Sequence, residues 1–172
     1  MTDLLKSIIR DIPDFPKKGI VFKDITPLLM NPEALHLAVV RLGEAADLWK
    51  PDKILGIESR GFIFGAALAM HRRLGFLPAR KKGKLPYEVV RAEYQLEYGT
   101  DALEMHADAV KPGERIMIVD DLLATGGTAE AIVRLIRQMG GNPVGAAFVI
   151  ELGFLSGRKR LDPLPVHSLL NY

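Results

Sequence analysis

The sequence predicts an α/β protein with a mainly parallel central sheet flanked by helices. Short apolar runs rich in β-branched residues alternate along the chain with longer segments of helical periodicity. Two of the strand-to-helix junctions carry polar side chains and glycine, and sheets of this kind bind ligands at the carboxyl ends of their strands. With 172 residues, the chain is expected to form a single domain, 1–172, with a sizeable core.

The N-terminal part is expected to alternate between helix and irregular chain. Thr2–Arg10 has the apolar spacing of a short amphipathic helix. Two prolines and a glycine interrupt regular structure in Ile12–Gly19, and Ile20–Leu29 is expected to be a short extended segment that leads to a turn. Asn31 and Pro32 are typical residues of a helix start, so the next helix is expected to begin there.

The middle of the chain is expected to contain two strands around a helix. Lys53–Glu58 predicts the first central strand, and a helix follows from Phe62 to about Arg73. Gly75–Ala79 predicts a second strand, which leads into the basic segment Arg80–Pro86. In Tyr87–Thr100, polar and apolar residues alternate with a period of two, which favours a β-hairpin with one exposed face.

The last part of the chain contains the most apolar predicted strand, Ile116–Val119, which is expected to be buried on both faces. The segment before it, Asp101–Val110, is expected to be helical or a loop. The remaining expected elements are a helix over Gly127–Met139, a strand over Val144–Glu151, a short helix over Phe154–Leu161 and a strand over Val166–Leu170.

The stretch Arg115–Thr128 carries the strongest functional signal. Its strand ends in Asp120 and Asp121, and the small residues Ala124–Thr128 lead into the next helix. A helix start offers about four unpaired N–H groups and roughly half a positive charge, so this loop suits a phosphate. The two carboxylates would repel phosphate but suit the cis-diol of a ribose or a metal ion. The pattern therefore predicts a phosphosugar site.

The same residues also have simpler interpretations. A Gly-Gly pair is often only a tight turn, and aspartate at a strand end is often an N-cap. The loop lacks the Gly-Lys-Ser/Thr of a P-loop, and it also lacks the spaced glycines of a dinucleotide-binding site. Two established classes of nucleotide-binding site are therefore not indicated.

Cations occur at two further strand ends. Ser59 and Arg60 precede a helix start, where a guanidinium group can engage two phosphate oxygens. Arg80, Lys81 and Lys84 follow the next strand and are expected at the same edge of the sheet, where they can neutralise an anionic ligand. A solvated surface is the alternative interpretation for both groups of cations.

Composition excludes several classes of protein. The net charge of +2 is too small to indicate a nucleic-acid partner, and the absence of cysteine excludes disulfides and thiolate metal sites. The four histidines lack the spacing of a zinc site. The first residues lack the pattern of a secretory signal, and no apolar run approaches the ~20 residues of a membrane span. A cytoplasmic protein without a membrane partner is expected.

Longer motifs resemble those of one family. Ile-Val-Asp-Asp-Leu-Leu-Ala-Thr-Gly-Gly-Thr, at Ile118–Thr128, resembles the motif with which type I phosphoribosyltransferases bind 5-phosphoribosyl 1-pyrophosphate (PRPP). Phe15–Leu29 resembles the hood of the adenine phosphoribosyltransferases, and Ser59–Gly65, Arg80–Pro86 and Leu96–Gly99 resemble their pyrophosphate loop, basic loop and catalytic lid. The resemblance implies the type I phosphoribosyltransferase fold with a small N-terminal hood, about 1–31, and a flexible lid, about 82–100.

The resemblance also implies an activity: the transfer of the 5-phosphoribosyl group from PRPP to adenine, which gives AMP and pyrophosphate in purine salvage. It implies Mg²⁺ held mainly by PRPP, and a homodimer. A 6-oxopurine phosphoribosyltransferase is an alternative, but such enzymes are not expected to share the hood motif. A regulator that senses PRPP and binds nucleic acid is another, but the chain has neither an additional domain nor a strong basic face.

Residue roles follow from the resemblance. The 5-phosphate would bind at Ala124, Thr125, Gly126, Gly127 and Thr128, and the ribose hydroxyls, near Mg²⁺, at Asp120 and Asp121. The pyrophosphate would lie among Ser59, Arg60, Arg80, Lys81 and Lys84, with a cis peptide bond expected between Ser59 and Arg60. Adenine would stack on Phe22 and Leu152 and meet the backbones of Val21 and Lys23, where many relatives have Arg in place of Lys23. Glu97, Tyr98 and Arg60 would be the catalytic side chains, with Gly99 as the hinge of the lid.

Overall fold

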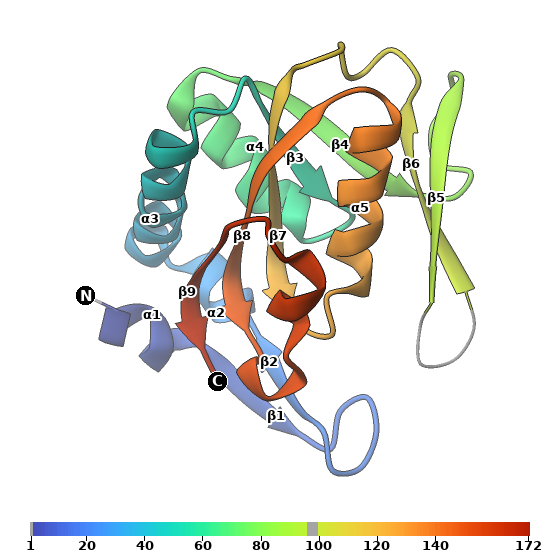
Figure 1. The fold of residues 1–172 in the computed structure, drawn as a ribbon. Coiled ribbons are helices and arrows are strands. Elements are labelled where there is room, and N and C mark those ends of the chain that lie inside the picture. Colours follow the sequence, from blue (N-terminus) through green and yellow to red (C-terminus); the bar gives the residue numbers. More distant parts are fainter. Residues whose placement is uncertain (1, 96–99) are drawn as a thin grey trace.

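A computed structural model describes residues 2–95 and 100–172 of the protein. Among these residues, one sheet contains the strands β3 (Lys53–Ile57), β4 (Gly75–Lys81), β5 (Val89–Gln95), β6 (Thr100–His106), β7 (Arg115–Leu123), β8 (Asn142–Glu151) and β9 (Val166–Asn171). Their order is β5-β6-β4-β3-β7-β8-β9 (Figure 1). The strands from β4 to β9 in this order run parallel, whereas β6 and β5 continue the sheet antiparallel. The predicted mainly parallel sheet is confirmed.

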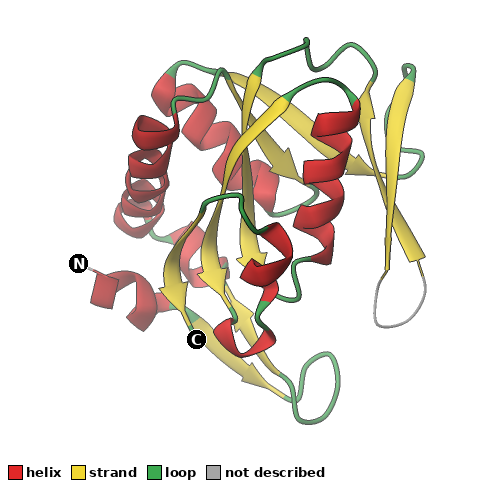
Figure 2. Cartoon of the chain, viewed as in Figure 1, coloured by secondary structure: helices red, strands yellow, loops and turns green. Residues whose placement is uncertain are grey.

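Helices cover both faces of the sheet, as Figure 2 shows. Helices α3 (Pro32–Trp49) and α4 (Gly61–Arg72) pack on one face, and α5 (Gly127–Gln138) packs on the other. Asn31 caps α3, because its side-chain oxygen accepts hydrogen bonds from the backbone N–H groups of the second and third helical residues, both at 3.0 Å. The predicted start of this helix is confirmed.

Strand β7 explains the two-sided core. Ile116 and Ile118 belong to the hydrophobic cluster on the α5 side, whereas Met117 and Val119 belong to the cluster on the α3 and α4 side. All four side chains are fully buried. Alternate residues of a strand point to opposite faces, so an uninterrupted apolar run suits a strand with helices on both sides.

The N-terminal segment 2–31, which we call the hood, lies at the carboxyl ends of the parallel strands (Figure 1). It contains α1 (Thr2–Ile8), a ribbon of β1 (Arg10–Pro13) and antiparallel β2 (Val21–Asp24), and α2 (Thr26–Met30). The first helix ends two residues before the predicted Arg10, and Arg10–Pro13 is a strand rather than irregular chain. Pairing with β2 outweighs the tendency of Pro13 to interrupt a strand. Pro13 is the last residue of β1, where a proline is tolerated in a short ribbon.

The hairpin of β5 and β6 is longer than predicted. The expected helix or loop at Asp101–Val110 is wrong for its first half, because β6 runs to His106 and pairs with both β5 and β4. Ala, Leu, Glu and Met in this segment favour a helix intrinsically. The burial of Leu103 and Met105 against the core overrides that preference.

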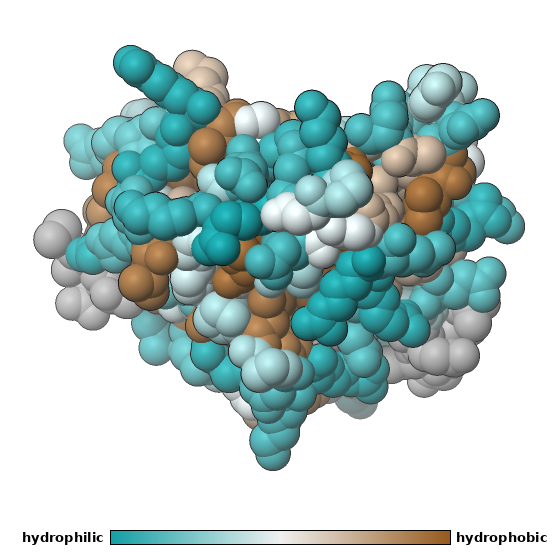
Figure 3. All heavy atoms as spheres, turned by 45° about the horizontal axis from the view of Figure 1, so that its top comes forward, coloured by the Kyte–Doolittle hydropathy of each residue, from teal (hydrophilic) through white to brown (hydrophobic). Residues whose placement is uncertain are grey.

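Further differences concern the ends of elements. Strand β7 extends four residues past Val119, so both aspartates lie within the strand. The expected short helix at Phe154–Leu161 consists of two 3₁₀ turns, η1 (Gly153–Leu155) and η2 (Gly157–Leu161). No helix in the described part of the chain is long and apolar enough to cross a membrane. Figure 3 shows a largely hydrophilic face in which hydrophobic residues are scattered.

Candidate active site

A cavity of about 340 Å³ lies at the carboxyl ends of β3, β4 and β7, beside the start of α5. This is the edge of the sheet where the sequence predicts the ligand site. Several elements that are distant in sequence contribute to its wall. The predicted site residues in the cavity wall are Ser59, Arg60, Lys81, Asp120, Asp121, Ala124, Thr125, Gly126 and Thr128.

The loop between β7 and α5 is shaped by close backbone packing. Gly126 caps α5 in the left-handed region, with φ +84°. A Cβ atom at Gly126 would overlap the carbonyl oxygen of Gly157, and a Cβ atom at Gly157 would overlap that of Ala124. Glycine is therefore required at Gly126 both for its conformation and for space. Gly127 is buried as the first residue of α5 and does not line the cavity.

Asp120 and Asp121 differ in their surroundings. Asp121 is buried, with its side chain 7% exposed, and its carboxylate lies 2.9 Å from Nε of Arg60. One carboxylate oxygen of Asp120 accepts the backbone N–H of Asp121 at 2.9 Å. Burial, and then the charge of Asp121, raise the pKa of Asp120 well above its usual range. Burial also raises the pKa of Asp121, against the opposing effect of Arg60.

The start of α4 lies directly against β7. A Cβ atom at Gly61 would come within 2.7 Å of a carboxylate oxygen of Asp120. The absence of a side chain at Gly61 therefore lets Arg60 approach the aspartate pair. In this way the two predicted strand-to-helix junctions form one site.

The predicted cis peptide bond between Ser59 and Arg60 is wrong by one position, because the cis bond joins Glu58 to Ser59. Ser59 and Arg60 already belong to the first turn at α4. Their carbonyl groups accept hydrogen bonds from Phe62 and Ile63 at 3.2 and 3.1 Å, and Arg60 has right-handed helical angles. The unusual bond therefore precedes this turn.

The basic segment is organised by Glu58. Its carboxylate accepts the backbone N–H of Lys81 at 2.9 Å and lies 3.3 Å from Nε of Arg80. Arg80 also donates to the carbonyl of Lys84 at 3.1 Å. Lys81 lines the cavity, whereas Arg80 and Lys84 do not. Burial opposes ionisation of Glu58, but the backbone N–H of Lys81 and the guanidinium of Arg80 together hold its pKa below the usual value.

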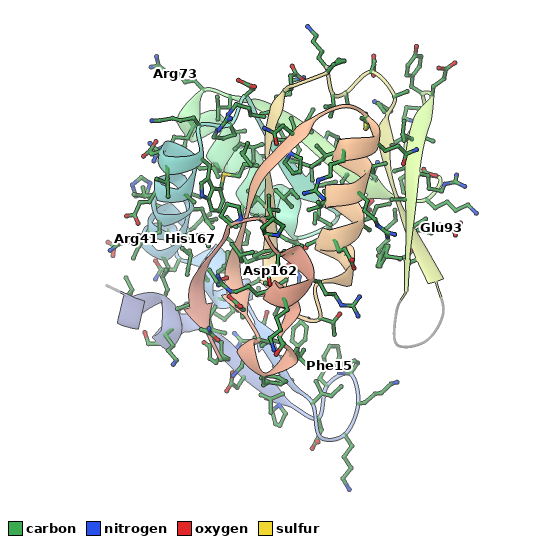
Figure 4. The ribbon with its side chains drawn as sticks, in the orientation of Figure 1. Phe15, Arg41, Arg73, Glu93, Asp162 and His167 are labelled. Atoms are coloured by element: carbon green, nitrogen blue, oxygen red, sulfur yellow. The ribbon has the colours of Figure 1, made fainter. Side chains whose placement is uncertain are left out.

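The residues predicted to bind the base lie beside the cavity rather than in its wall. The guanidinium of Arg60 lies 5.3 Å from the ring centre of Phe22, and the ring of Phe15 packs edge-on against Phe22 with centroids 5.2 Å apart. Figure 4 shows Phe15 on the turn of the hood. Val21 is 50% exposed, and half-buried Leu152 donates its N–H to the carbonyl of Leu123, a residue of the cavity wall, at 2.9 Å.

The comparisons with known proteins agree in sequence and in fold. The family model of the phosphoribosyl transferase domain matches residues 33–165. A curated adenine phosphoribosyltransferase from Synechococcus sp. (strain CC9605) is 59% identical over 98% of both chains. The chain belongs to the adenine phosphoribosyltransferases.

Solved structures of this family have the same fold. The adenine phosphoribosyltransferase from Rhodothermus marinus DSM 4252 is 56% identical, with a TM-score of 0.94 over 99% of this chain and 98% of its own. The enzyme from Saccharomyces cerevisiae, solved in complex with an imino-altritol bisphosphate and adenine, is 42% identical, with a TM-score of 0.92 over 98% and 97%. The predicted fold class and family are confirmed, and the alternative activities are not favoured.

Sequence reasoning missed two polar side chains in the cavity wall of this phosphoribosyltransferase, Glu58 and Tyr94, as well as the apolar ones. Tyr94 is 9% exposed, and its hydroxyl donates to Asp101 at 3.2 Å. Burial and Asp101 raise the pKa of Tyr94 to about 12. The sequence did contain a signal, because Tyr94 lies on the apolar side of the alternating hairpin pattern. The predicted catalytic residues Glu97 and Tyr98, and the hinge Gly99, lie outside the described residues.

The residues of the site fit a magnesium ion that arrives with its substrate. The described residues contain no group of three or more histidine or acidic side chains that could hold a metal. Asp120 and Asp121 offer carboxylate oxygens, and Arg60 already pairs with Asp121. Mg²⁺ prefers about six oxygen ligands and is usually held by one or two carboxylates together with substrate phosphates. The phosphoryl and ribose oxygens of PRPP would have to supply the remaining ligands.

Proposed function

We propose that the cavity binds PRPP in an extended form and that the hood brings adenine to its ribose end. The observation that carries this proposal is the convergence of three groups on one cavity: the start of α5, the pair Asp120 and Asp121, and Arg60. These groups suit a phosphate, a diol and a pyrophosphate in that order. The reaction is the one supported by the comparisons, in which adenine and PRPP give AMP and pyrophosphate.

The 5-phosphate is proposed to bind to the loop Ala124–Thr128. The start of α5 supplies unpaired N–H groups and the positive end of a helix dipole, and Thr125 and Thr128 add hydroxyl donors. Asp120 and Asp121 are proposed to accept hydrogen bonds from the ribose hydroxyls. A rigid grip on the sugar lowers the barrier by fixing the anomeric carbon relative to its reaction partners.

The pyrophosphate is proposed to lie near Ser59, Arg60 and Lys81, with Arg80 and Lys84 around it. Negative charge develops on the leaving oxygen while the anomeric carbon becomes oxocarbenium-like. Arg60 and Lys81 line the cavity and can oppose that charge. Arg80, by contrast, pairs with Glu58 and would need to leave that contact to reach the substrate directly. Asp120 and Asp121 would help to hold the Mg²⁺ that arrives with PRPP, and the ion would supply neutralisation of charge on the leaving group.

Adenine is proposed to stack between Phe22 and Leu152, with its edge read by the backbones of Val21 and Lys23. The solved Saccharomyces cerevisiae enzyme, which has bound adenine, supports a base site in this fold. Glu97 is proposed to exchange a proton with the purine ring. Tyr98 is proposed to close over the site, with Gly99 as the hinge, so that water does not capture the cation.

Two broader properties are also proposals. A homodimer is supported by apolar side chains that α4 leaves exposed, namely Ile63 (41%) and Met70 (84%). A mass measurement in solution tests it, because a monomeric mass of 19.0 kDa would contradict the proposal. A cytoplasmic location remains a prediction.

The decisive experiment is an initial-rate assay with PRPP and each of four bases: adenine, hypoxanthine, guanine and xanthine. We expect turnover with adenine at least about a hundredfold above the other three, because a site that hydrogen-bonds a substrate edge rejects bases lacking it. Removal of Mg²⁺ with a chelator should abolish turnover. Preference for a 6-oxopurine would contradict the proposed base site.

The side chains are tested in the same assay. Glu97→Ala should lower kcat by about a hundredfold with little change in PRPP binding. Phe22→Ala should raise the KM for adenine and leave that for PRPP unchanged. Unaltered kcat in the first variant, or an unaltered adenine KM in the second, would remove that residue from the proposed mechanism.

A further inference from the structure

The side chain of Lys23 has no part in the proposed function, which uses only its backbone. In strand β2, Phe22 and Lys23 are consecutive and therefore point to opposite faces of the hood ribbon. Phe22 faces Arg60 at 5.3 Å, whereas Nζ of Lys23 lies 4.0 Å from the centre of the Tyr172 ring. The two faces of the ribbon are thus held by different partners.

The contact between Lys23 and Tyr172 is well defined. The Lys23 side chain is only 11% exposed, and its ammonium group also pairs with Asp11 on the neighbouring strand at 2.7 Å. Lys6, from α1, reaches the same ring at 5.3 Å. Burial and the Asp11 carboxylate raise the pKa of Tyr172, so the ring is neutral at physiological pH. A partly desolvated ammonium over an aromatic face is a favourable cation–π contact.

The backbone of Tyr172 contacts the segment of Leu152, which forms the other wall of the proposed adenine slot opposite Phe22. Its N–H donates to Glu151 at 3.0 Å, and its carbonyl accepts the N–H of Gly153 at 2.9 Å. Leu152 lies between Glu151 and Gly153, so the backbone of Tyr172 is hydrogen-bonded to the residues on both sides of Leu152. Figure 1 shows the end of β9 reaching the ribbon of β1 and β2. One residue therefore contacts both segments that carry the proposed base-stacking side chains.

We propose that Tyr172 is a positioning residue that sets the width of the adenine slot, which is the distance between Phe22 and Leu152. Its ring holds Lys23, and thereby the neighbouring Phe22, and its backbone holds the segment that carries Leu152. This inference rests on the proposed adenine site. The contact between Arg60 and Phe22 cannot hold Phe22 in place throughout the reaction, because Arg60 is proposed to engage pyrophosphate. The Lys23–Tyr172 contact lies on the face of the ribbon away from Arg60 and remains available when substrates bind.

The test is a double-mutant cycle of Tyr172→Leu and Lys23→Met in initial-rate assays. Leucine keeps apolar volume but lacks a π face, and methionine keeps length but lacks charge. Each single variant should raise the KM for adenine about three- to tenfold, the order expected for a desolvated cation–π contact, with kcat and the KM for PRPP within about twofold of wild type. The double variant should add less than about twofold to the larger single effect, because both changes remove the same contact.

Two further variants complete the design. Tyr172→Phe keeps the ring and should restore the adenine KM to within about twofold of wild type, since the cation–π contact needs no hydroxyl. Lys18→Met removes an exposed lysine of the hood turn and is the matched control for Lys23→Met. Additive effects in the cycle, equal rises in both KM values, or a Tyr172→Phe variant as impaired as Tyr172→Leu would overturn the proposal.

The outcome is separable from that of the adenine site itself. If Phe22→Ala raises the KM for adenine while Tyr172→Leu does not, the site stands and the positioning role is wrong. If Phe22→Ala has no effect, the site assignment is wrong. Should Tyr172→Leu fail to fold, Lys23→Met must still raise the KM for adenine selectively, and its failure to do so rejects the inference.

Discussion

The loop between β7 and α5, which is proposed to bind phosphate, and the hood are built in different ways. The loop at Ala124–Thr128 follows a strand that is buried on both faces, and its shape depends on backbone atoms in close contact at Gly126 and Gly157. The helices of the hood are anchored by Leu5, Ile25 and Leu28, which are buried in the core. Its ribbon of β1 and β2, by contrast, has exposed apolar side chains at Phe15 and Val21, and contacts such as those of Lys23 and Phe22 hold it to the rest of the chain. Backbone packing therefore shapes the loop, whereas the ribbon of the hood depends on individual side-chain contacts.

This difference matches the proposed division of labour. The phosphate and the diol of the sugar are common to all phosphoribosyl transfer, so the shape of their binding site can be set by backbone packing. The base differs between relatives of other specificity, and side chains on a separate ribbon can change without disturbing the sheet. Substitutions in the loop should therefore weaken substrate binding more than substitutions in the contacts around it.

Gly126→Ala should have the largest effect. The new Cβ would overlap the carbonyl of Gly157 at a residue with φ +84°. We expect the affinity for PRPP to fall by at least about a hundredfold and the free energy of unfolding to fall by about 2–4 kcal/mol. Calorimetry with PRPP and urea denaturation measure the two effects.

Gly113→Ala is the matched control for steric overlap. Gly113 also has a positive φ, +80°, but nothing lies within 4 Å of its Cβ position. This variant should lose only about 1–2 kcal/mol of stability and keep its PRPP affinity. Equal losses in the two glycine variants would show that packing on Gly157 is unimportant.

The double variant Asp120→Asn with Asp121→Asn should come next. Loss of charged acceptors for the ribose hydroxyls should weaken PRPP binding by about thirty- to a hundredfold, consistent with the strength of charge-assisted hydrogen bonds. Asp47→Asn removes a carboxylate that pairs with Arg72 on the surface and should leave binding unchanged. Normal PRPP affinity in the double variant would contradict the diol assignment.

Arg60→Ala tests the contact between the two regions. Arg60 touches Asp121 on the loop side and Phe22 on the hood side. Affinity for pyrophosphate should fall by about ten- to thirtyfold, and affinity for AMP by less than about threefold. Isothermal titration with each product measures both. Losses of similar size would mean that Arg60 supports the site generally and does not serve the leaving group.

The smallest expected effect concerns stability and pH. The pKa of Asp120 is higher in the folded state than in the unfolded state. Its contribution to the free energy of unfolding is therefore complete below the unfolded pKa of about 4 and is lost as the pH rises through the folded pKa. Asp120→Asn removes this loss. The variant should therefore be more stable than wild type near pH 8, with no gain in stability near pH 4.

Urea denaturation without ligand at pH 4, 6 and 8 measures this difference. The carboxylates of Glu104 and Glu151 have lowered pKa values, so their contributions are lost as the pH falls. They are the same in both proteins and cancel in the comparison. A variant that is equally destabilised at all three pH values would show that Asp120 is a structural residue without a perturbed charge.

Local pattern was sufficient to predict the parallel strands and the short loop between β7 and α5. The run Ile116–Val119 is apolar throughout, and the acidic and small residues after it follow directly in sequence, so no distant partner is needed to recognise them. The same is true of the start of α3 at Asn31 and Pro32. These features depend on contacts within a few residues.

The errors arose where a distant partner decided the structure. Arg10–Pro13 is a strand because β2 pairs with it, and Asp101–His106 is a strand because β5 and β4 pair with it, against local preference in both segments. Tyr94 reaches the cavity because its hairpin packs beside α5, where Arg134 donates to the carbonyl of Glu93 at 2.8 Å. Figure 4 shows Glu93 on this strand.

The amino-acid sequence by itself determined the parallel strands and helices of the sheet, the short loop between β7 and α5, and the family, because each of these depends on residues that are close together along the chain. Tertiary structure decided how these parts meet. Arg60 pairs with Asp121, and Arg80 pairs with Glu58. Lys23 contacts the ring of Tyr172, from the opposite end of the sequence. Such pairings depend on packing between segments far apart in the chain, which local patterns do not encode.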